Sequence, residues 1–352
     1  ITIGTATTLT TTNSQITFSG TVNSEASEAN DLTLSVGSSE VQFDAVVGTG
    51  TNGALGTIGI TGALDLDAAI GSGAIAGADA LTVSTTSNIG ADITTTNNQT
   101  YTGTVTMSGG NRILRSNSGT INNQSTIAGG SANLTITGNL NSDGAISSTT
   151  VFSVSGTSDL GANVTTTDTQ TYTGAVTISA DVTLTTSGDT VTFSHTVDGG
   201  YALTVDTDGT DDASALATVQ FAGVVGGSTP LAAIIVTGNL DLDADIIQSD
   251  NTAGASSLEV AGTSNLGASV TTNGSQTYTG AVTLSADITL DANDTSGTTT
   301  TYSTATTTNV TIASNETVTQ IALIGGGGGL GGNDGSSYPG SNGGAAGYYV
   351  VS

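Results

Sequence analysis

A chain of 352 residues with 36% hydrophobic and only 9% charged residues has the composition of a folded protein rather than a disordered one. Its charge is one-sided, since 29 acidic residues stand against two arginines, for a net charge of −27. The sequence therefore lacks the basic patch that nucleic acid requires, and it has no apolar run long enough for a transmembrane helix. We expect no nucleic-acid partner and no membrane insertion.

The residue types favour strands. Thr, Val and Ile, which prefer strands, alternate with Gly, Asn and Asp, which prefer turns. No long apolar stripe with a period of 3.6 residues is present, so helix should be minor. Cysteine is absent, so stability has to come from strand pairing and burial. These features predict an all-β fold.

The N-terminal part of the chain contains strand signatures that return further on. The similar pairs of segments are 16–22 with 191–197, 41–48 with 219–226, and 61–68 with 237–244. The spacing between successive signatures is mostly about 18 to 28 residues, which is the length of one turn of a β-solenoid. Repetition of this kind is typical of proteins built by stacking one unit on the next.

A longer signature occurs three times. It ends in Gln99-Thr-Tyr-Thr-Gly103, Gln170-Thr-Tyr-Thr-Gly174 and Gln276-Thr-Tyr-Thr-Gly280, and each copy begins 13 residues earlier at Thr86, Thr157 or Thr263. The copies are 71 residues (170−99) and 106 residues (276−170) apart. The shorter interval lacks one matching signature, so we predict that it lacks one whole rung. Loss of a rung shortens a solenoid but would remove several strands from an immunoglobulin-like sandwich.

Alternation within a rung indicates which side chains face inward. In segment 175–184, Val176, Ile178, Val182 and Leu184 are predicted to point into the core, and the Ala180-Asp181 step to form a corner. We predict a right-handed parallel β-helix (β-solenoid) of about 13 to 15 rungs, roughly 60–70 Å long at about 4.8 Å per rung.

Candidate chemistry is sparse. The segment Asp206-Thr-Asp208-Gly-Thr-Asp211-Asp212 offers four carboxylates around a glycine turn, and carboxylate oxygens are the ligands that Ca²⁺ prefers. We predict Asp206, Asp208, Asp211 and Asp212 as a Ca²⁺ site, although a solvated acidic turn is the simpler interpretation. The spacing differs from that of an EF-hand loop. A second acidic group, Asp241, Asp243 and Asp245, is predicted to be solvated.

Catalysis is not expected. His195 is the only histidine, and it stands where the matching rung has Gly20. Lyase-type proton abstraction needs a basic group, and lysine is absent. The run 325–329 contains no Gly-Lys-Ser/Thr, so it is not a phosphate loop. We predict that the chain is not an enzyme.

The last part of the chain has a different composition. Residues 298–308 are almost all Ser and Thr, two strand-like segments follow at 310–313 and 318–324, and then a Gly-rich stretch begins. We therefore predict two regions, a repeat-built solenoid over 1–297 and a module of Thr-rich strands with a Gly-rich terminal part over 298–352.

The repeats resemble those of bacterial β-strand-repeat and filamentous-haemagglutinin-like surface proteins. The likeness lies in the segments 276–284 and 219–227 and extends over about residues 7–292. The resemblance implies a secreted, right-handed β-helix at the cell surface. We expect an extracellular structural protein that self-associates head to tail, as a subunit of a filament, fibre or matrix. The alternative is an adhesin or stalk segment that binds a carbohydrate or a cell surface.

Overall fold

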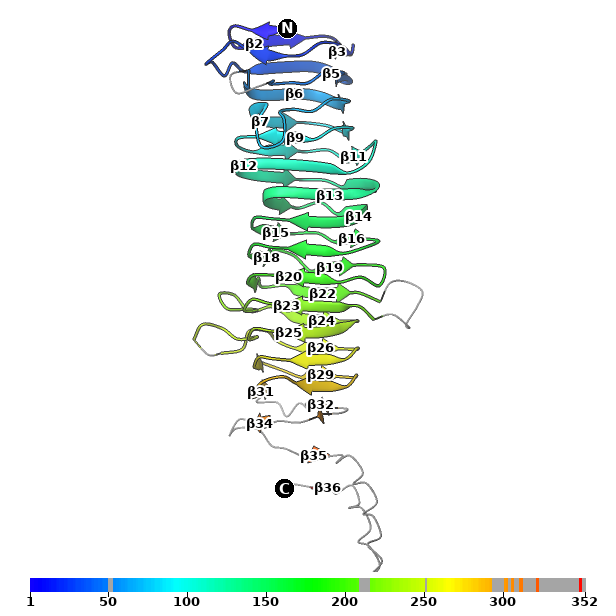
Figure 1. The fold of residues 1–352 in the computed structure, drawn as a ribbon, viewed down its shortest axis with the longest axis vertical. Coiled ribbons are helices and arrows are strands. Elements are labelled where there is room, and N and C mark those ends of the chain that lie inside the picture. The colour runs from blue at the N-terminus through cyan, green and yellow to red at the C-terminus, as the bar shows by residue number, and fades with distance from the viewer. Residues whose placement is uncertain are drawn as a thin grey trace, which may run out of the picture.

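The structure of the chain is a computed structural model. It describes residues 1–49, 53–208, 216–250 and 252–292, together with five short strands further on. The described part contains strands and turns but no helix, and hence none that could span a membrane. The strands stack in parallel along one axis into a rod of about 13 turns (Figure 1). The predicted all-β solenoid is confirmed, whereas its right-handed sense stays a prediction.

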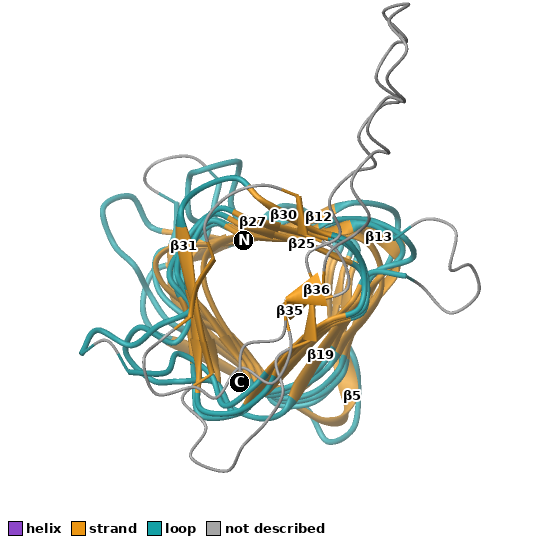
Figure 2. Cartoon of the chain, turned by 90° about the horizontal axis from the view of Figure 1, so that it is seen from below, coloured by secondary structure: helices purple, strands orange, loops and turns teal. Residues whose placement is uncertain are grey.

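Each full turn passes through three faces, which form the three sides seen along the rod in Figure 2. We call them faces A, B and C in the order in which the chain visits them. Several long strands bend around corners and contribute to more than one face. Each face is a column of strands paired in register with the turn before and the turn after.

Face A is the column that contains Gln99. Its members are β2 (Thr7–Thr10), the first parts of β5 (Leu32–Phe43) and β6 (Leu55–Leu66), β7 (Ala78–Val83), β10 (Gln99–Tyr101), the last parts of β12 (Arg112–Asn123) and β13 (Ile127–Ser142), β15 (Ser158–Leu160), β18 (Val176–Ile178), β21 (Val197–Asp198), single bridges at Val225 and Ile246, β28 (Val270–Thr272), β31 (Ile288–Ala292) and β34 (Val310–Ile312).

Face B is the column that contains Gln276. Its members are β3 (Ile16–Phe18), the last parts of β5 and β6, β8 (Ser87–Ile89), β11 (Val105–Met107), the first parts of β13 and β14 (Ile146–Val154), β16 (Val164–Thr166), β19 (Val182–Thr185), β22 (Ala202–Asp206), β24 (Ala233–Val236), β26 (Leu258–Val260), β29 (Gln276–Tyr278) and β32 (Thr301–Tyr302).

Face C is the column that contains Gln170. It begins with single bridges at Val22, Val47 and Ile70 and continues with β9 (Ile93–Thr95), the first part of β12, the middle of β13, the last part of β14, β17 (Gln170–Tyr172), β20 (Val191–Phe193), β23 (Thr218–Phe221), β25 (Asn239–Leu242), β27 (Ser264–Leu266), β30 (Val282–Leu284) and β33 (Ala305–Thr306).

The core lies between the three faces. Strand residues alternate between inward and outward positions, and the inward residues form one continuous apolar cluster along the rod. Val176, Ile178, Val182 and Leu184 are all buried, as predicted. Phe193 stacks on Tyr172 and on Phe221, with ring centroids 5.3 and 5.0 Å apart, because parallel register places equal positions of successive turns above one another.

The stacking explains the two unequal repeat lengths. From Gln99, three turns on face A lead through Ile121 and Leu140 to Ser158, and two further strands lead to Gln170 on face C. From Gln170, four turns on face C lead through Val191, Val219 and Leu240 to Ser264, and two further strands lead to Gln276 on face B. The difference is one full turn, so the prediction of a missing rung is confirmed. Each copy of the signature also lies on a different face.

Asn and Asp side chains at the corners connect neighbouring turns. Their Oδ1 atoms accept a hydrogen bond from a backbone N–H of the next turn, at distances of 2.6 to 3.3 Å. The predicted corner at Asp181 is one of these, since Asp181 accepts from Ala202 N at 2.9 Å. The other acceptors are Asn13, Asn23, Asp31, Asp92, Asn98, Asn111, Asn133, Asn139, Asn163, Asp198, Asn239 and Asp245.

Two strand pairs form small sheets of their own. At the N-terminal end β1 (Thr2–Ile3) pairs in parallel with β4 (Asn23–Ser24). Towards the C-terminus β35 (Ile321–Ala322) pairs with β36 (Tyr348–Tyr349), and this pair is antiparallel. Parallel pairing on all three faces continues through β32, β33 and β34. The division of the chain at residue 297 stays a prediction, and the Gly run 325–329 lies outside the described residues.

Candidate functional site

The repeated signature forms a buried hydrogen-bonded group in the core. Gln99, Gln170 and Gln276 are fully buried, and the tyrosine two residues later donates its hydroxyl hydrogen to the Gln Oε1 in each copy, at 2.9, 3.0 and 3.3 Å. The Gln Nε2 donates to the carbonyl of Arg115, Thr185 or Asp291 on the neighbouring face, at 2.7, 2.9 and 2.9 Å. It also lies within bonding distance of a carbonyl on the preceding strand of that face, from Ile93, Val164 or Val270.

This arrangement ties three strands together at a corner. The glutamine amide joins two stacked strands of one face to its own strand on the next face, so a polar group is buried with its partners supplied. Burial raises the pKa of Tyr101 and of Tyr172 far above the ordinary value, so both phenols stay protonated and act as donors. The signature therefore has a structural role, and it does not form a surface site.

One further member of this group was missed by the sequence reasoning. A buried threonine four residues before each glutamine, Thr95, Thr166 or Thr272, accepts from the Gln Nε2 at 3.2 to 3.3 Å. Its presence in all three copies was a signal that could have identified it. The signature serine, Ser87, Ser158 or Ser264, points into the core, and its buried hydroxyl has no hydrogen-bond partner.

The predicted Ca²⁺ turn is described in part. Asp206 ends β22, and its Oδ1 accepts from Thr237 Oγ1 at 2.9 Å. A hydrogen bond with the Asp206 side chain, then burial and the charge of Asp206, raise the pKa of Asp208 above its usual value of 3.8. Asp211 and Asp212 lie outside the described residues. Ca²⁺ at this turn stays a prediction, and among the described residues no group of three His, Cys, Asp or Glu side chains is placed to hold a metal ion.

The second acidic group is used in side-chain pairs between turns. Asp241 accepts from Asn265 Nδ2 and Asp243 accepts from Gln220 Nε2, both at 2.8 Å, and Asp245 is one of the corner acceptors. Arg112, one of the two cations, is buried and donates to the carbonyls of Ile89, Ser108 and Asn111. The Arg112 charge is thus bound to backbone oxygens, and the chain as a whole carries a net charge of −27.

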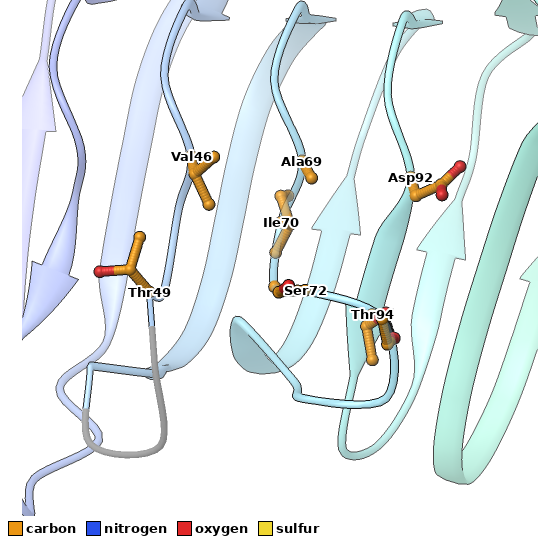
Figure 3. Close-up of a pocket in the computed structure, with 9 residues that line it drawn as sticks. Val46, Thr49, Ala69, Ile70, Ser72, Asp92 and Thr94 are labelled. Carbon is orange, nitrogen blue, oxygen red and sulfur yellow. Dashed lines mark hydrogen bonds between the residues drawn. The ribbon is translucent and has the colours of Figure 1, made fainter.

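One surface cleft, with a volume of about 450 Å³, lies where the chain leaves face C for face A. Figure 3 shows that its side chains come from equivalent positions of three successive turns. Val46, Ala69 and Asp92 each precede the residue that bridges to the next turn of face C. The lining residues are Val46, Thr49, Ala69, Ile70, Gly71, Ser72, Gly73, Asp92 and Thr94.

A short hairpin over residues 71–77 borders this cleft. Ser72 and Ile75 pair in antiparallel fashion through two backbone hydrogen bonds of 2.9 Å. The hairpin is braced from neighbouring turns, because Thr94 Oγ1 donates to Gly73 O at 2.8 Å and Asn117 Nδ2 donates to Ala74 O at 3.1 Å. Ile75 is 41% exposed. The cleft combines hydroxyl groups, backbone polar groups, one carboxylate and a partly apolar floor.

No protein-family model, no curated protein and no solved structure matches this chain. The resemblance to bacterial β-strand-repeat and filamentous-haemagglutinin-like surface proteins therefore stays a prediction. What the geometry defines is a parallel β-solenoid whose repeated signature lies in its core.

Proposed function

We propose that this chain is an extracellular structural protein, a rod that serves as a subunit of a filament, fibre or matrix at the cell surface. The observation that supports this most strongly is the use of the repeated residues. Gln, Tyr and Thr of the signature are buried and join neighbouring strands, and the repeats differ by one full turn. The repeated sequence thus serves to make the rod longer, which is what a stalk or fibre needs.

Head-to-tail association of identical chains is the mode of assembly that we propose. Every turn offers the same rows of backbone N–H and C=O groups along the rod axis, and such edges pair with further strands unless they are covered. A contact between unlike ends of two copies propagates into a filament unless the rotation closes a ring. The high negative charge works against side-by-side contact and favours growth along the axis.

The experiment is electron microscopy of the purified protein at neutral pH, with and without Ca²⁺, together with light scattering over a range of concentrations. Filaments whose length increases with concentration would support the proposal. A protein that stays monomeric at high concentration would contradict it. The comparison with and without Ca²⁺ also tests the predicted site at the acidic turn.

The alternative function is that of an adhesin or stalk segment which binds a carbohydrate or a cell surface. The surface cleft beside the hairpin 71–77 is the observation that favours it. Of the aromatic residues in the described stretches up to residue 292, only Tyr201, at 47%, is strongly exposed, so stacking of sugar rings on a row of aromatic side chains is not available on this part of the rod. An adhesin of this kind would have to bind through hydrogen bonds. We propose no enzymatic activity.

A further inference from the structure

The cleft lies at an insertion into an otherwise regular corner. Thr94 alone separates Ile93 from Thr95 at this corner, and one residue likewise separates Val164 from Thr166 and Val270 from Thr272. One turn earlier, seven residues (71–77) separate Ile70 from Ala78, although Ala78 pairs with Thr95. Insertions in repeat proteins form loops on one side of the stack, often the binding side.

A comparable insertion recurs later in the chain at another corner, where the chain leaves face A for face B. After Ile246, the chain leaves its regular path and returns through an antiparallel bridge between Ile247 and Ala253. Both insertions have a close backbone contact at their base. Gly48 meets Gly77 in the first case and Gly226 meets Gly254 in the second, with no room for a Cβ atom in either contact. The interval from Gln99 to Gln170 has no such insertion. At its comparable corner, only Ser147 and Ser148 lie between Ile146 and Thr149.

The hairpin 71–77 is held in place before any ligand binds. Its own backbone bonds, the Thr94 and Asn117 side chains, and the bonds from Gly71 N to Val47 O and from Gly77 N to Thr94 O fix it against three turns. A site that is already ordered loses little conformational entropy on binding. The cleft has a volume of about 450 Å³ and is open to solvent, so a ligand would rest in it with one side exposed.

The lining indicates the chemistry of the ligand. Ser72 and Thr49 are exposed hydroxyl residues, and the floor is made by the partly buried Val46 and Ala69. Asp92 is exposed, with one carboxylate oxygen accepting from Ile113 N at 2.9 Å. This carboxylate and the net charge of −27 repel anions, whereas a cationic partner would find equal attraction along the whole rod. A neutral ligand rich in hydroxyl groups matches the cleft best.

We propose that the cleft between Val46, Ser72 and Asp92 is a binding site for an uncharged polysaccharide. The cleft binds the sugar hydroxyls through Ser72, Thr49 and Asp92, and the C–H side of the sugar ring rests on Val46 and Ala69. This inference rests on the adhesin alternative and specifies where on the rod the carbohydrate would bind. It does not depend on head-to-tail assembly.

The test uses the full chain and a panel of immobilised polysaccharides. The panel contains uncharged glucans, mannans, galactans and chitin, with polygalacturonate as the anionic member and polylysine as a cationic polymer. The key variant replaces residues 71–77 by Ser-Ser, the pair that spans the comparable corner after Ile146. We expect the wild type to bind at least one uncharged polysaccharide with little dependence on salt, and the variant to lose one site per chain.

Two point variants refine the test. Asp92→Asn keeps an oxygen acceptor for Ile113 N and should weaken glycan binding only modestly, whereas Asp181→Asn makes the same change at a corner outside the cleft and should have no effect. The proposal is overturned if no uncharged polysaccharide binds, if the shortened variant binds as well as the wild type, or if binding is confined to polylysine and is lost with salt. Circular dichroism and electron microscopy of the shortened variant show separately whether the rod and any filaments are intact.

Discussion

At the scale of single residues, the chain is organised around a few buried polar groups. Gln99, Gln170 and Gln276 lie in an apolar core, where each unpaired amide group would cost free energy, and each finds partners on two stacked strands. The partners are mainly backbone carbonyls, which every turn supplies regardless of sequence. The same motif can therefore occur on any of the three faces, and it does so.

Truncation of this group should be costly. Gln170→Ala removes the bonds to Tyr172 Oη, Val164 O and Thr185 O, and leaves the fully buried Tyr172 hydroxyl without its partner. We expect a loss of about 3 kcal/mol or more in the free energy of unfolding, and about 1–2 kcal/mol for Tyr172→Phe, which removes a single bond. Denaturant unfolding of both variants, with the outward-facing Thr171→Ala as control, provides the measurement. Equal midpoints for Gln170→Ala and Thr171→Ala would contradict the structural role of the glutamine.

A pH effect is expected at Asp208. Its raised pKa means that the folded chain binds this proton more tightly than the unfolded chain. The resulting stabilisation is present below pH 3.8, the ordinary value, and is lost as the pH rises through the raised pKa. The melting temperature of the wild type relative to Asp208→Asn should therefore fall as the pH rises through this range.

Asp250 provides a control of opposite sign. Hydrogen bonds from the hydroxyl and the N–H of Thr252 lower the pKa of Asp250, so its contribution is present above pH 3.8 and is lost as the pH falls. The melting temperature of the wild type relative to Asp250→Asn should change with pH in the other direction. A parallel pH dependence for the two variants would show that only the overall negative charge matters.

At the scale of elements, much of the fold could be predicted from sequence. The alternation in segment 175–184 identified its inward residues, and the missing signature identified the missing turn. The position of the three signatures on three faces could not be predicted, because corner lengths vary from one residue after Ile93 to seven after Ile70. Without the pairing register, residue counts do not give the number of strands in a repeat.

The candidate site was harder to predict than the fold. Sequence reasoning concentrated on carboxylates, yet many of them accept hydrogen bonds within the rod, as Asp181 does from Ala202 N. The cleft was missed because its residues, such as Val46, Ala69 and Asp92, are separated by a full turn and carry no motif. The segments around Gly48 and Gly226 do recur in the sequence. Their close backbone contact with a glycine one turn away, however, can be seen only in the structure.

The glycine contacts at the two insertions can be tested directly. Gly226 has φ +72°, and a Cβ atom there would overlap the backbone of Gly254. Gly226→Ala should therefore destabilise the protein by about 2 kcal/mol or more, through strain and displacement of the loop. Gly200→Ala is the matched control, since nothing lies within 4 Å of its new Cβ atom. Equal melting temperatures for the two variants would show that the loop can shift to accept the Cβ atom without loss of stability.

At the scale of the whole molecule, the turn is the unit of length and three strands make a turn. In a stacked protein each turn contacts mainly its two neighbours, so stability is close to a sum over turns and interfaces. About 13 turns at about 4.8 Å each give a rod roughly 62 Å long, within the predicted range. The chain already contains intervals of different length, which indicates that a turn can be lost without disturbing the others.

This leads to a prediction about deletions. Removal of residues 158–175, one full turn, brings Val176 over Leu140, Leu184 over Ile146 and Val191 over Phe152, so that apolar residues still stack on all three faces. The shortened chain should fold, keep its β-type circular dichroism per residue and unfold with little loss of cooperativity. Its rod should be shorter by about 4.8 Å, measurable by small-angle X-ray scattering.

Removal of residues 158–163 alone is the matched comparison. This deletion takes out one strand of face A and its corner. Every later strand then has to shift to the next face, or one turn keeps only two strands. The shift separates Tyr172 from Phe152 and moves the later strands off the faces on which they now stack, although Gln170 moves together with Val164 and Thr185. The six-residue deletion should therefore be more damaging than the eighteen-residue one, with a lower melting temperature and lost protection from hydrogen exchange around residues 164–193. If the smaller deletion is the better tolerated, the three-strand turn is not the unit from which this protein is built.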